Sequence, residues 1–149
     1  FGYRVPISNY LSGKKVCYSG WGDDAHVRFF RRTAGEYAKT LIHEYLQLPK
    51  PQGRLTNVIE HHTKISLEKV KKYARLQAQE IDRSSKTVFY GGQIIFRPVL
   101  RFLETYINRK GILDGVNGFR IASKDGLEVF YKLLYFIELR RKRSREGLS

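Results

Sequence analysis

The sequence predicts a mixed α/β fold in which short N-terminal strands precede three or so amphipathic helices. Two observations predict it. Segments rich in β-branched and aromatic residues, separated by Gly, Ser and Asn, occupy residues 1–62. From residue 63 onward, apolar side chains recur every three to four residues with Lys and Arg between them, which is the period of a helix. At 149 residues the chain is long enough for one domain with a core, so we expect a single unit over 1–149.

Three short strands are expected in the first part, at Tyr3–Ile7, Lys15–Tyr18 and Val27–Arg31. The first two are separated by Ser8–Gly13, whose Ser, Asn and Gly residues predict a turn or loop. Pro49–Gly53 is predicted to be a loop, because two prolines and a glycine do not fit inside a regular element.

The second part is predicted to be mostly helical. Ser66 is the expected N-cap of a basic amphipathic helix, and a second helix should have Pro98 at its first position and stop at Gly111. Val88–Phe96 fits either a strand or a helix. Gly111–Phe119 lacks the spacing of a phosphate-binding loop and is expected to be a tight turn between helices. A last helix, apolar nearly all round, is expected at about Asp125–Lys142.

Composition indicates an anionic partner. The chain has 28 basic and 14 acidic residues, a net charge of +14, which suits a nucleotide phosphate, a nucleic acid or an anionic membrane surface. The single cysteine, Cys17, excludes an internal disulfide, and no apolar run approaches the roughly 20 residues that span a bilayer. The chain begins with Phe1 and has no methionine, so we expect it to be part of something longer. The basic cluster Arg140–Arg145 suits docking on an anionic membrane, or is the solvated tail of a core helix.

Polar and aromatic residues are concentrated between Gly20 and His62, at a density typical of a functional site. The stretch contains the only tryptophan, an acidic pair, an arginine cluster and all four histidines. The candidate site residues are, in order, Trp21, Asp23, Asp24, Arg28, Arg31, Arg32, His43, Glu44, His61 and His62.

Each residue of this stretch has a chemical and a structural interpretation. Glu44 fits a general base or an ordinary exposed acid, and the Asp23–Asp24 pair could bind a metal, orient a sugar hydroxyl or offset the nearby arginines. His61 or His62 could supply one ligand to a divalent metal, although one ligand does not make a site. Trp21 offers a flat apolar face for a sugar ring, or fills a core.

Several blocks together carry a family resemblance over nearly the whole chain. They are Gly20-Trp21-Gly22-Asp23-Asp24, Arg28-Phe29-Phe30-Arg31-Arg32, Ile42-His43-Glu44, His61, Arg101-Phe102-Leu103, and Tyr106 through Lys110-Gly111-Ile112-Leu113-Asp114-Gly115 to Gly118-Phe119. In this order the sequence resembles family 2 glycosyltransferases of the lipopolysaccharide core biosynthesis type. The resemblance implies the C-terminal, acceptor-side half of a GT-A enzyme, because no Asp-x-Asp motif after a strand is present. Residues 1–62 would be its strand-rich catalytic part and residues 63–149 its helical, membrane-docking part.

The resemblance implies inverting transfer of a sugar from a nucleotide-sugar donor, such as a UDP-sugar, to a lipid-linked saccharide. A divalent metal, Mg²⁺ or Mn²⁺, is expected in the complete enzyme, with His61 or His62 as its contact. Glu44 would be the base, with Asp24 as the second choice. The expected substrate-binding residues are Trp21 under the acceptor sugar, Arg28, Arg31 and Arg32 on phosphate, and Asp23 and His43.

The expected location is cytoplasmic, peripheral at the inner face of the bacterial inner membrane. Two other classes compete with the transferase. One is a basic module for single-stranded nucleic acid, which the charge and the 10 Tyr and 9 Phe would serve. We disfavour it because most aromatics fall on the apolar faces of predicted helices and no nucleic-acid motif is present. The other is a non-catalytic membrane-docking domain.

Overall fold

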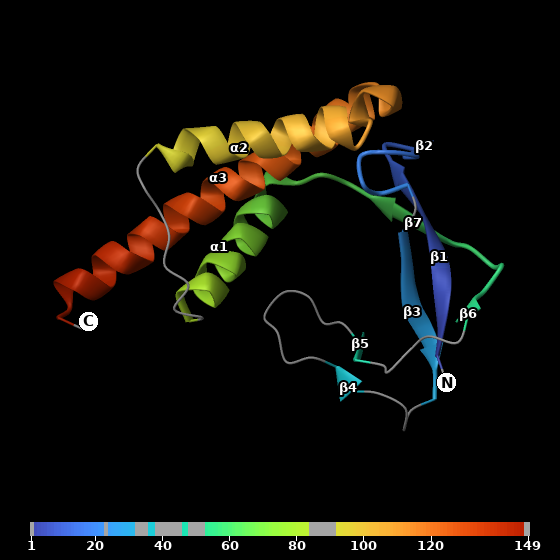
Figure 1. Cartoon of the computed structure of the whole chain (residues 1–149), viewed down its shortest axis with the longest axis horizontal. Helices are drawn as coiled ribbons and strands as arrows, with labels where there is room; N and C mark the ends of the chain where they lie inside the picture. Colours follow the sequence, from blue (N-terminus) through green and yellow to red (C-terminus); the bar gives the residue numbers. More distant parts are fainter. Residues whose placement is uncertain are drawn as a thin grey trace.

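The computed structural model describes residues 2–22, 24–31, 36–37, 46–47, 53–83 and 92–147, with backbone alone at 36–37 and 46–47. The fold is mixed α/β, as predicted, with a small sheet followed by helices (Figure 1). The strands are β1 Gly2–Leu11, β2 Lys14–Lys15, β3 Asp24–Phe30, β4 Glu36–Tyr37, β5 Leu46–Gln47, β6 Gly53–Arg54 and β7 Ile59–Thr63. The helices are α1 Leu67–Arg83, α2 Gln93–Leu103, the π-helical turn η1 Glu104–Asn108, the 3₁₀ turn η2 Gly111–Asp114, and α3 Val116–Arg145.

Strand β1 is the centre of the sheet. It pairs antiparallel with β2 and β3 on one side and parallel with β6 and β7 on the other. The prediction of a loop over Ser8–Gly13 was wrong for its first four residues, because β1 runs on to Leu11. The turn is confined to Ser12 and Gly13, whose φ angles of 52° and 77° are the left-handed pair that a two-residue hairpin requires. Asn9, a loop signal by residue type, instead lies buried within the strand.

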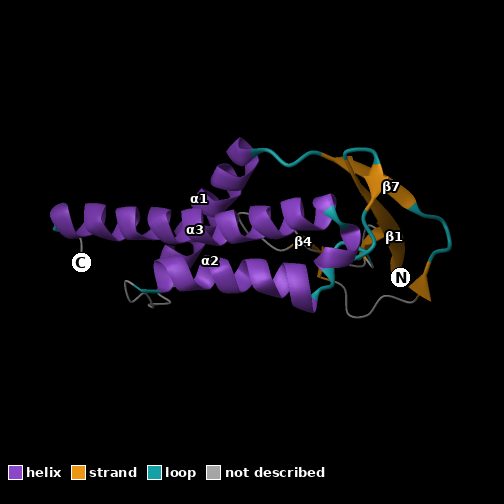
Figure 2. Ribbon diagram, turned by 90° about the horizontal axis from the view of Figure 1, so that it is seen from above, coloured by secondary structure: helices purple, strands orange, loops and turns teal. Residues whose placement is uncertain are grey.

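Helix α3 packs between α1 and α2 (Figure 2). It begins at Val116, well before the expected Asp125, and its glycines are packing residues rather than breaks. A Cβ on Gly126 would lie 3.0 Å from the Pro98 carbonyl oxygen, and one on Gly118 would lie 1.7 Å from the carbonyl oxygen of Gly111. The absence of a side chain at these positions therefore permits α3 to approach α2 and η2 closely.

The second helix also differs from the sequence prediction. Pro98 lies inside α2, which begins at Gln93 rather than at Pro98. The helical path continues through η1 and ends where Lys110 adopts the left-handed conformation, φ 56°, immediately before Gly111. The predicted stop near Gly111 is confirmed. The turn predicted over Gly111–Phe119 is shorter than expected, because it ends at Gly115 and Val116–Phe119 belong to α3.

A small core joins the sheet to the helices. Leu11, Val16 and Ile121 are almost fully buried together, and Trp21 packs against them from the edge. The buried Asn117 side chain donates a hydrogen bond of 2.8 Å to the carbonyl oxygen of Leu11. These contacts fix the end of β1 against the first turns of α3.

Asp114 holds the turn that carries the tryptophan. Its carboxylate accepts hydrogen bonds from the backbone N–H of Cys17 at 2.9 Å, from that of Tyr18 at 3.0 Å, and from Ser19 Oγ at 2.8 Å. The Ser19 N–H donates to the Arg109 carbonyl oxygen at 2.9 Å. Residues nearly a hundred positions apart in the sequence thereby form one rigid corner next to Trp21.

Two arginines of the C-terminal basic cluster form ion pairs within the protein. Asp82, at the end of α1, is buried and contacts Arg143 Nη2 at 2.5 Å and Arg140 Nε at 3.2 Å. Leu133 and Phe136 of α3 are buried nearby. This end of α3 is therefore packed against α1, which favours the interpretation as a core helix. Among the described helices, none is long and apolar enough to cross a membrane.

Candidate functional site

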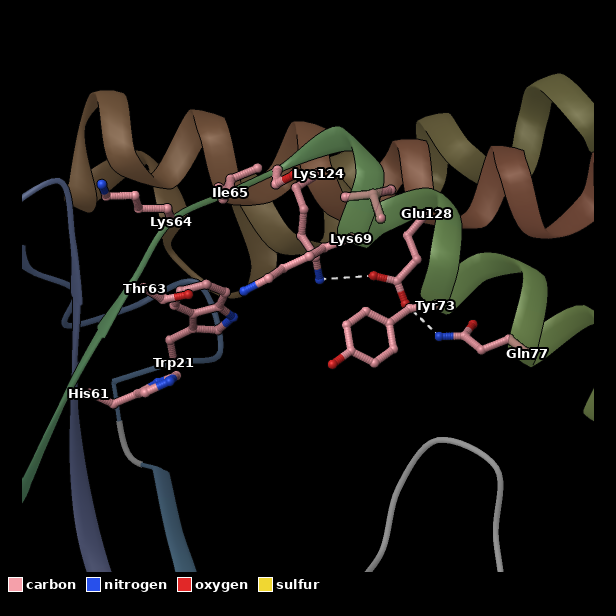
Figure 3. A pocket seen from close by; sticks show the side chains of 12 residues that line it. Trp21, His61, Thr63, Lys64, Ile65, Lys69, Tyr73, Gln77, Lys124 and Glu128 are labelled. Carbon is pink, nitrogen blue, oxygen red and sulfur yellow. Dashed lines mark hydrogen bonds and ion pairs between the residues drawn. The ribbon is translucent and has the colours of Figure 1, made fainter.

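A hollow of about 420 Å³ lies between the sheet and the helices, close to the Trp21 turn (Figure 3). One wall comes from Trp21, His61 of β7 and the segment after that strand, and the other comes from α1 and α3. Its lining residues are Trp21, His61, Thr63, Lys64, Ile65, Ser66, Lys69, Val70, Tyr73, Gln77, Lys124 and Glu128. Two residues predicted from the sequence, Trp21 and His61, thus line the same hollow.

Asn9 connects the predicted residues behind this wall. Its side chain is 5% exposed, and its Nδ2 donates to the carbonyl oxygen of Trp21 at 3.0 Å and to Asp24 Oδ2 at 3.4 Å. Its Oδ1 lies 3.0 Å from His61 Nδ1. One buried amide therefore holds Trp21, Asp24 and His61 in a fixed relation.

The network also sets the tautomer of His61. Because Asn9 Nδ2 faces two acceptors, its Oδ1 must face the imidazole, and His61 Nδ1 must donate the proton. In the neutral ring this leaves Nε2 as a hydrogen-bond acceptor. Since His61 lines the hollow, it can accept a proton or a hydrogen bond from a bound hydroxyl.

His62 has a different environment from His61. Its ring stacks on Tyr10 at 4.8 Å between centroids, and its Nε2 lies 3.5 Å from Glu60 Oε2. Successive side chains on a strand point to opposite faces of a sheet, so the two histidines cannot face the same hollow. Of the pair, His61 alone lines this hollow.

The helical wall supplies positive charge. In Figure 3 the Lys69 side chain extends from α1 toward Trp21. Lys124 Nζ lies 2.9 Å from Glu128 Oε2, and Gln77 donates to the other oxygen of Glu128. Burial lowers the pKa of Lys124, but the Asp125 and Glu128 carboxylates outweigh it and hold that pKa above its ordinary value. Lys124 is therefore charged at neutral pH.

A second hollow, of about 510 Å³, adjoins the first and shares Lys64, Ile65, Val70 and Lys124 with it. The rest of its lining combines apolar side chains with two hydroxyls and one arginine: Leu11, Ser12, Leu67, Phe119, Arg120, Ser123 and Leu127. The two hollows together form a polar compartment beside an apolar compartment with a cationic rim.

Other predicted residues lie away from the hollow. The Asp24 carboxylate is engaged on both oxygens, by Asn9 and by His26 Nε2 at 3.0 Å. Arg28 is the extra residue of a β-bulge, because Val27 and Phe29 pair with the consecutive residues Arg4 and Tyr3. Arg28 and Arg31 are exposed, and neither lines the hollow of Trp21 and His61. Two of the three arginines expected on phosphate therefore lie away from the hollow that His61 lines.

Asp23, Arg32, His43 and Glu44 lie outside the described residues. Their predicted roles therefore remain predictions.

The described part of the chain contains no set of ligands for the expected metal. His61 offers one nitrogen, His62 faces the other side of the sheet, and no group of three or more His, Cys, Asp or Glu gathers there in a way that could hold an ion. We derive no chemical step through a metal.

Sequence reasoning missed Asn9, Asp114, Lys69 and Lys124. Asn9 was assigned to a loop by residue type, although the alternation of Val5, Ile7 and Leu11 around it would have placed it on the inner face of a strand. Lys69 belongs to the basic face of α1, and Lys124 belongs to the first part of α3, which was not predicted as helix. Neither position has a local signal for a pocket, because the opposite wall comes from a distant strand.

Comparisons with known proteins give no family for this chain. No protein-family model matches it, and no curated protein or solved structure is found to be similar.

Proposed function

We propose that this chain is the acceptor-binding part of an inverting glycosyltransferase that transfers a sugar from a nucleotide sugar, such as a UDP-sugar, to a lipid-linked saccharide. The observation that carries the proposal is the shared wall of Trp21 and His61, locked by Asn9, opposite the cation of Lys69. A flat indole, a hydrogen-bond acceptor and an ammonium group are suited to a sugar ring, its hydroxyl and an attached phosphate.

The adjoining hollow supports a lipid-linked acceptor. Its apolar lining and the cations Lys64 and Arg120 match a molecule with a hydrocarbon part and an anionic headgroup. A saccharide seated against Trp21 could extend its lipid part into this second compartment, since the two hollows share residues.

In the proposed reaction a base removes the proton of the acceptor hydroxyl, the oxygen bonds to the anomeric carbon, and the bond to the nucleoside diphosphate breaks. Glu44 is the proposed base from the family resemblance, and Asp24 is the second choice. The engagement of both Asp24 oxygens favours Glu44. His61 Nε2 would orient the hydroxyl by accepting its hydrogen bond.

The remaining assignments belong to this proposal. Arg28, Arg31 and Arg32 would contact phosphate, and Asp23 and His43 would contact substrate. The complete enzyme would use Mg²⁺ or Mn²⁺ and act as a peripheral protein on the cytoplasmic face of a bacterial inner membrane.

Tryptophan fluorescence tests the binding step directly, because Trp21 is the only tryptophan. Titration with detergent-dispersed lipopolysaccharide truncated within its inner core should change the emission saturably. His61→Ala should weaken this binding about fivefold, because the variant loses one hydrogen bond to the saccharide. His62→Ala, its neighbour on the opposite face, should bind as the unaltered chain does.

Two results would overturn the proposal. One is the absence of any saturable response to the lipopolysaccharide. The other is a stronger response to a single-stranded oligonucleotide that His61→Ala leaves unchanged, which would instead assign the chain to the nucleic-acid class.

A further inference from the structure

Helix α2 and the turn η1 expose an extended apolar face. Six side chains along this path are 40% to 74% exposed: Ile95, Phe96, Val99, Leu100, Leu103 and Ile107. They follow one another at intervals of one, three or four residues, which places them on one side of a helix. Single exposed apolar residues are ordinary, but a row of six on one face marks an interaction surface.

This face is distinct from the one that packs on the protein. Ile94, Pro98, Phe102 and Thr105 lie on the opposite side of the same helical path and are half-buried or buried. Thr105 is fully buried and donates to Asp125 Oδ2 of α3 at 2.9 Å. Helix α2 therefore has one apolar side packed against α3 and a second apolar side that is largely exposed.

The surroundings of the exposed face are cationic. From Gly92 to Leu113 the sequence has four basic residues, Arg97, Arg101, Arg109 and Lys110, and one acid, Glu104. That acid is neutralised locally, because Arg101 and Arg109 contact it at 2.9 Å and 2.8 Å. These guanidiniums hold the pKa of Glu104 below its ordinary value, so the pairs persist at neutral pH.

We propose that this face, the α2–η1 face, docks on an anionic phospholipid bilayer, with the helix lying in the plane of the interface. A surface helix that combines a wide apolar face with flanking cations is the arrangement that binds such interfaces. At 1.5 Å per residue, Gln93 to Asn108 spans about 24 Å along the membrane surface. The net charge of +14 favours an anionic membrane over a neutral protein partner.

The proposal assigns docking to α2 rather than to the C-terminal basic cluster. Among the described residues, no large apolar side chain after Leu127 is exposed, so the end of α3 that carries the cluster lacks an apolar face like that of α2 and η1. Membrane docking would serve the proposed transfer to a lipid-linked acceptor, but it depends on neither the Trp21 hollow nor any catalysis. The two proposals can therefore fail separately.

Co-sedimentation with vesicles tests the inference. The chain should bind vesicles of phosphatidylcholine with phosphatidylglycerol, bind phosphatidylcholine alone more weakly, and lose affinity as salt is added. Phe96→Ser and Leu100→Ser should each weaken binding about tenfold, because each removes an inserted apolar side chain. Both residues are exposed, so the fold should persist, as circular dichroism would check. The matched control is Phe29→Ser on β3, where Phe29 is 58% exposed, and it should bind normally.

Three outcomes would overturn the inference: no binding to anionic vesicles, vesicle binding that Phe96→Ser and Leu100→Ser leave unchanged, or self-association without lipid that these two substitutions abolish. The last would show that a second copy of the chain covers the face. The variant His61→Ala separates this proposal from the previous one, since it should retain vesicle binding in full while losing lipopolysaccharide affinity.

Discussion

Replacing Asp114 with alanine should destabilise the protein by about 2–3 kcal/mol. The carboxylate accepts three hydrogen bonds, from two backbone N–H groups and one hydroxyl of the turn before Trp21. Hydrogen bonds to a charged group contribute roughly 1.5–3 kcal/mol each when buried, but two of these donors lie in exposed residues and can bond to water after the substitution. The loss should therefore correspond to about one such bond, chiefly the one from the hydroxyl of the buried Ser19, which is about 2–3 kcal/mol.

The assay is urea unfolding followed by circular dichroism, with Trp21 emission recorded in parallel. In Asp114→Ala the midpoint should fall and the native emission should move to longer wavelength, because the turn that holds the indole against the core is released. Glu138→Ala, which removes an exposed acid on α3, is the matched control and should change stability by less than about 0.5 kcal/mol. Equal stability of the two variants, with unchanged Trp21 emission, would refute the assignment of Asp114 as the link between the turn and the helices.

Three further predictions follow from the structure and the proposed function. In the complete transferase that we propose, Glu44→Gln should abolish transfer in a radiolabelled-sugar assay and leave folding intact. Near-normal turnover of that variant would remove Glu44 from the mechanism. Gly118→Ala should lower the free energy of unfolding in urea by roughly 3 kcal/mol or more, because its Cβ would lie 1.7 Å from the Gly111 carbonyl oxygen. Gly92→Ala is the control and should be tolerated, because a Cβ there meets nothing within 4 Å. Similar stabilities of the two variants would contradict the close approach of α3 to η2. Because the pKa of Glu104 is lowered, its ion pairs stabilise the fold at neutral pH, and this contribution is lost as the pH falls below the ordinary pKa of 4.5. Glu104→Gln should therefore reduce the loss of stability in acid. An unchanged dependence of the unfolding free energy on pH would argue against the pairs.

Local patterns predicted the helices well where one face is buried and the other charged. The helix expected after Ser66 is found at Leu67–Arg83, because its apolar positions repeat with the helical period and no competing signal interrupts them. Gly118, within the segment predicted as a turn, misled the start of α3, because the sequence does not distinguish a glycine that permits close packing from one that interrupts a helix. Pro98 misled the start of α2, because it lies inside the helix although prolines are common at the first helical position.

The sheet and the site depend on contacts that local patterns do not encode. Strand β1 pairs with β7, so that Asn9 lies opposite His61, although 52 residues separate them. The strand Ile59–Thr63 was not predicted, and the sequence could not say which of His61 and His62 would face a hollow. That distinction follows from the register, which brings the imidazole of His61 to the buried Asn9 amide. Trp21 was predicted as a site residue from its type alone, and its position depends on Asp114 far along the chain.

The central claim is that His61 presents Nε2 to the hollow beside Trp21 while Asn9 holds Nδ1, and nitrogen NMR of the histidine side chains tests it most directly. With His61→Ala and His62→Ala used for assignment, neutral His61 should show the proton on Nδ1, and truncated lipopolysaccharide should shift its Nε2 resonance while the His62 resonances stay in place. A proton on Nε2 of His61, or a ligand-induced shift confined to His62, would contradict the account.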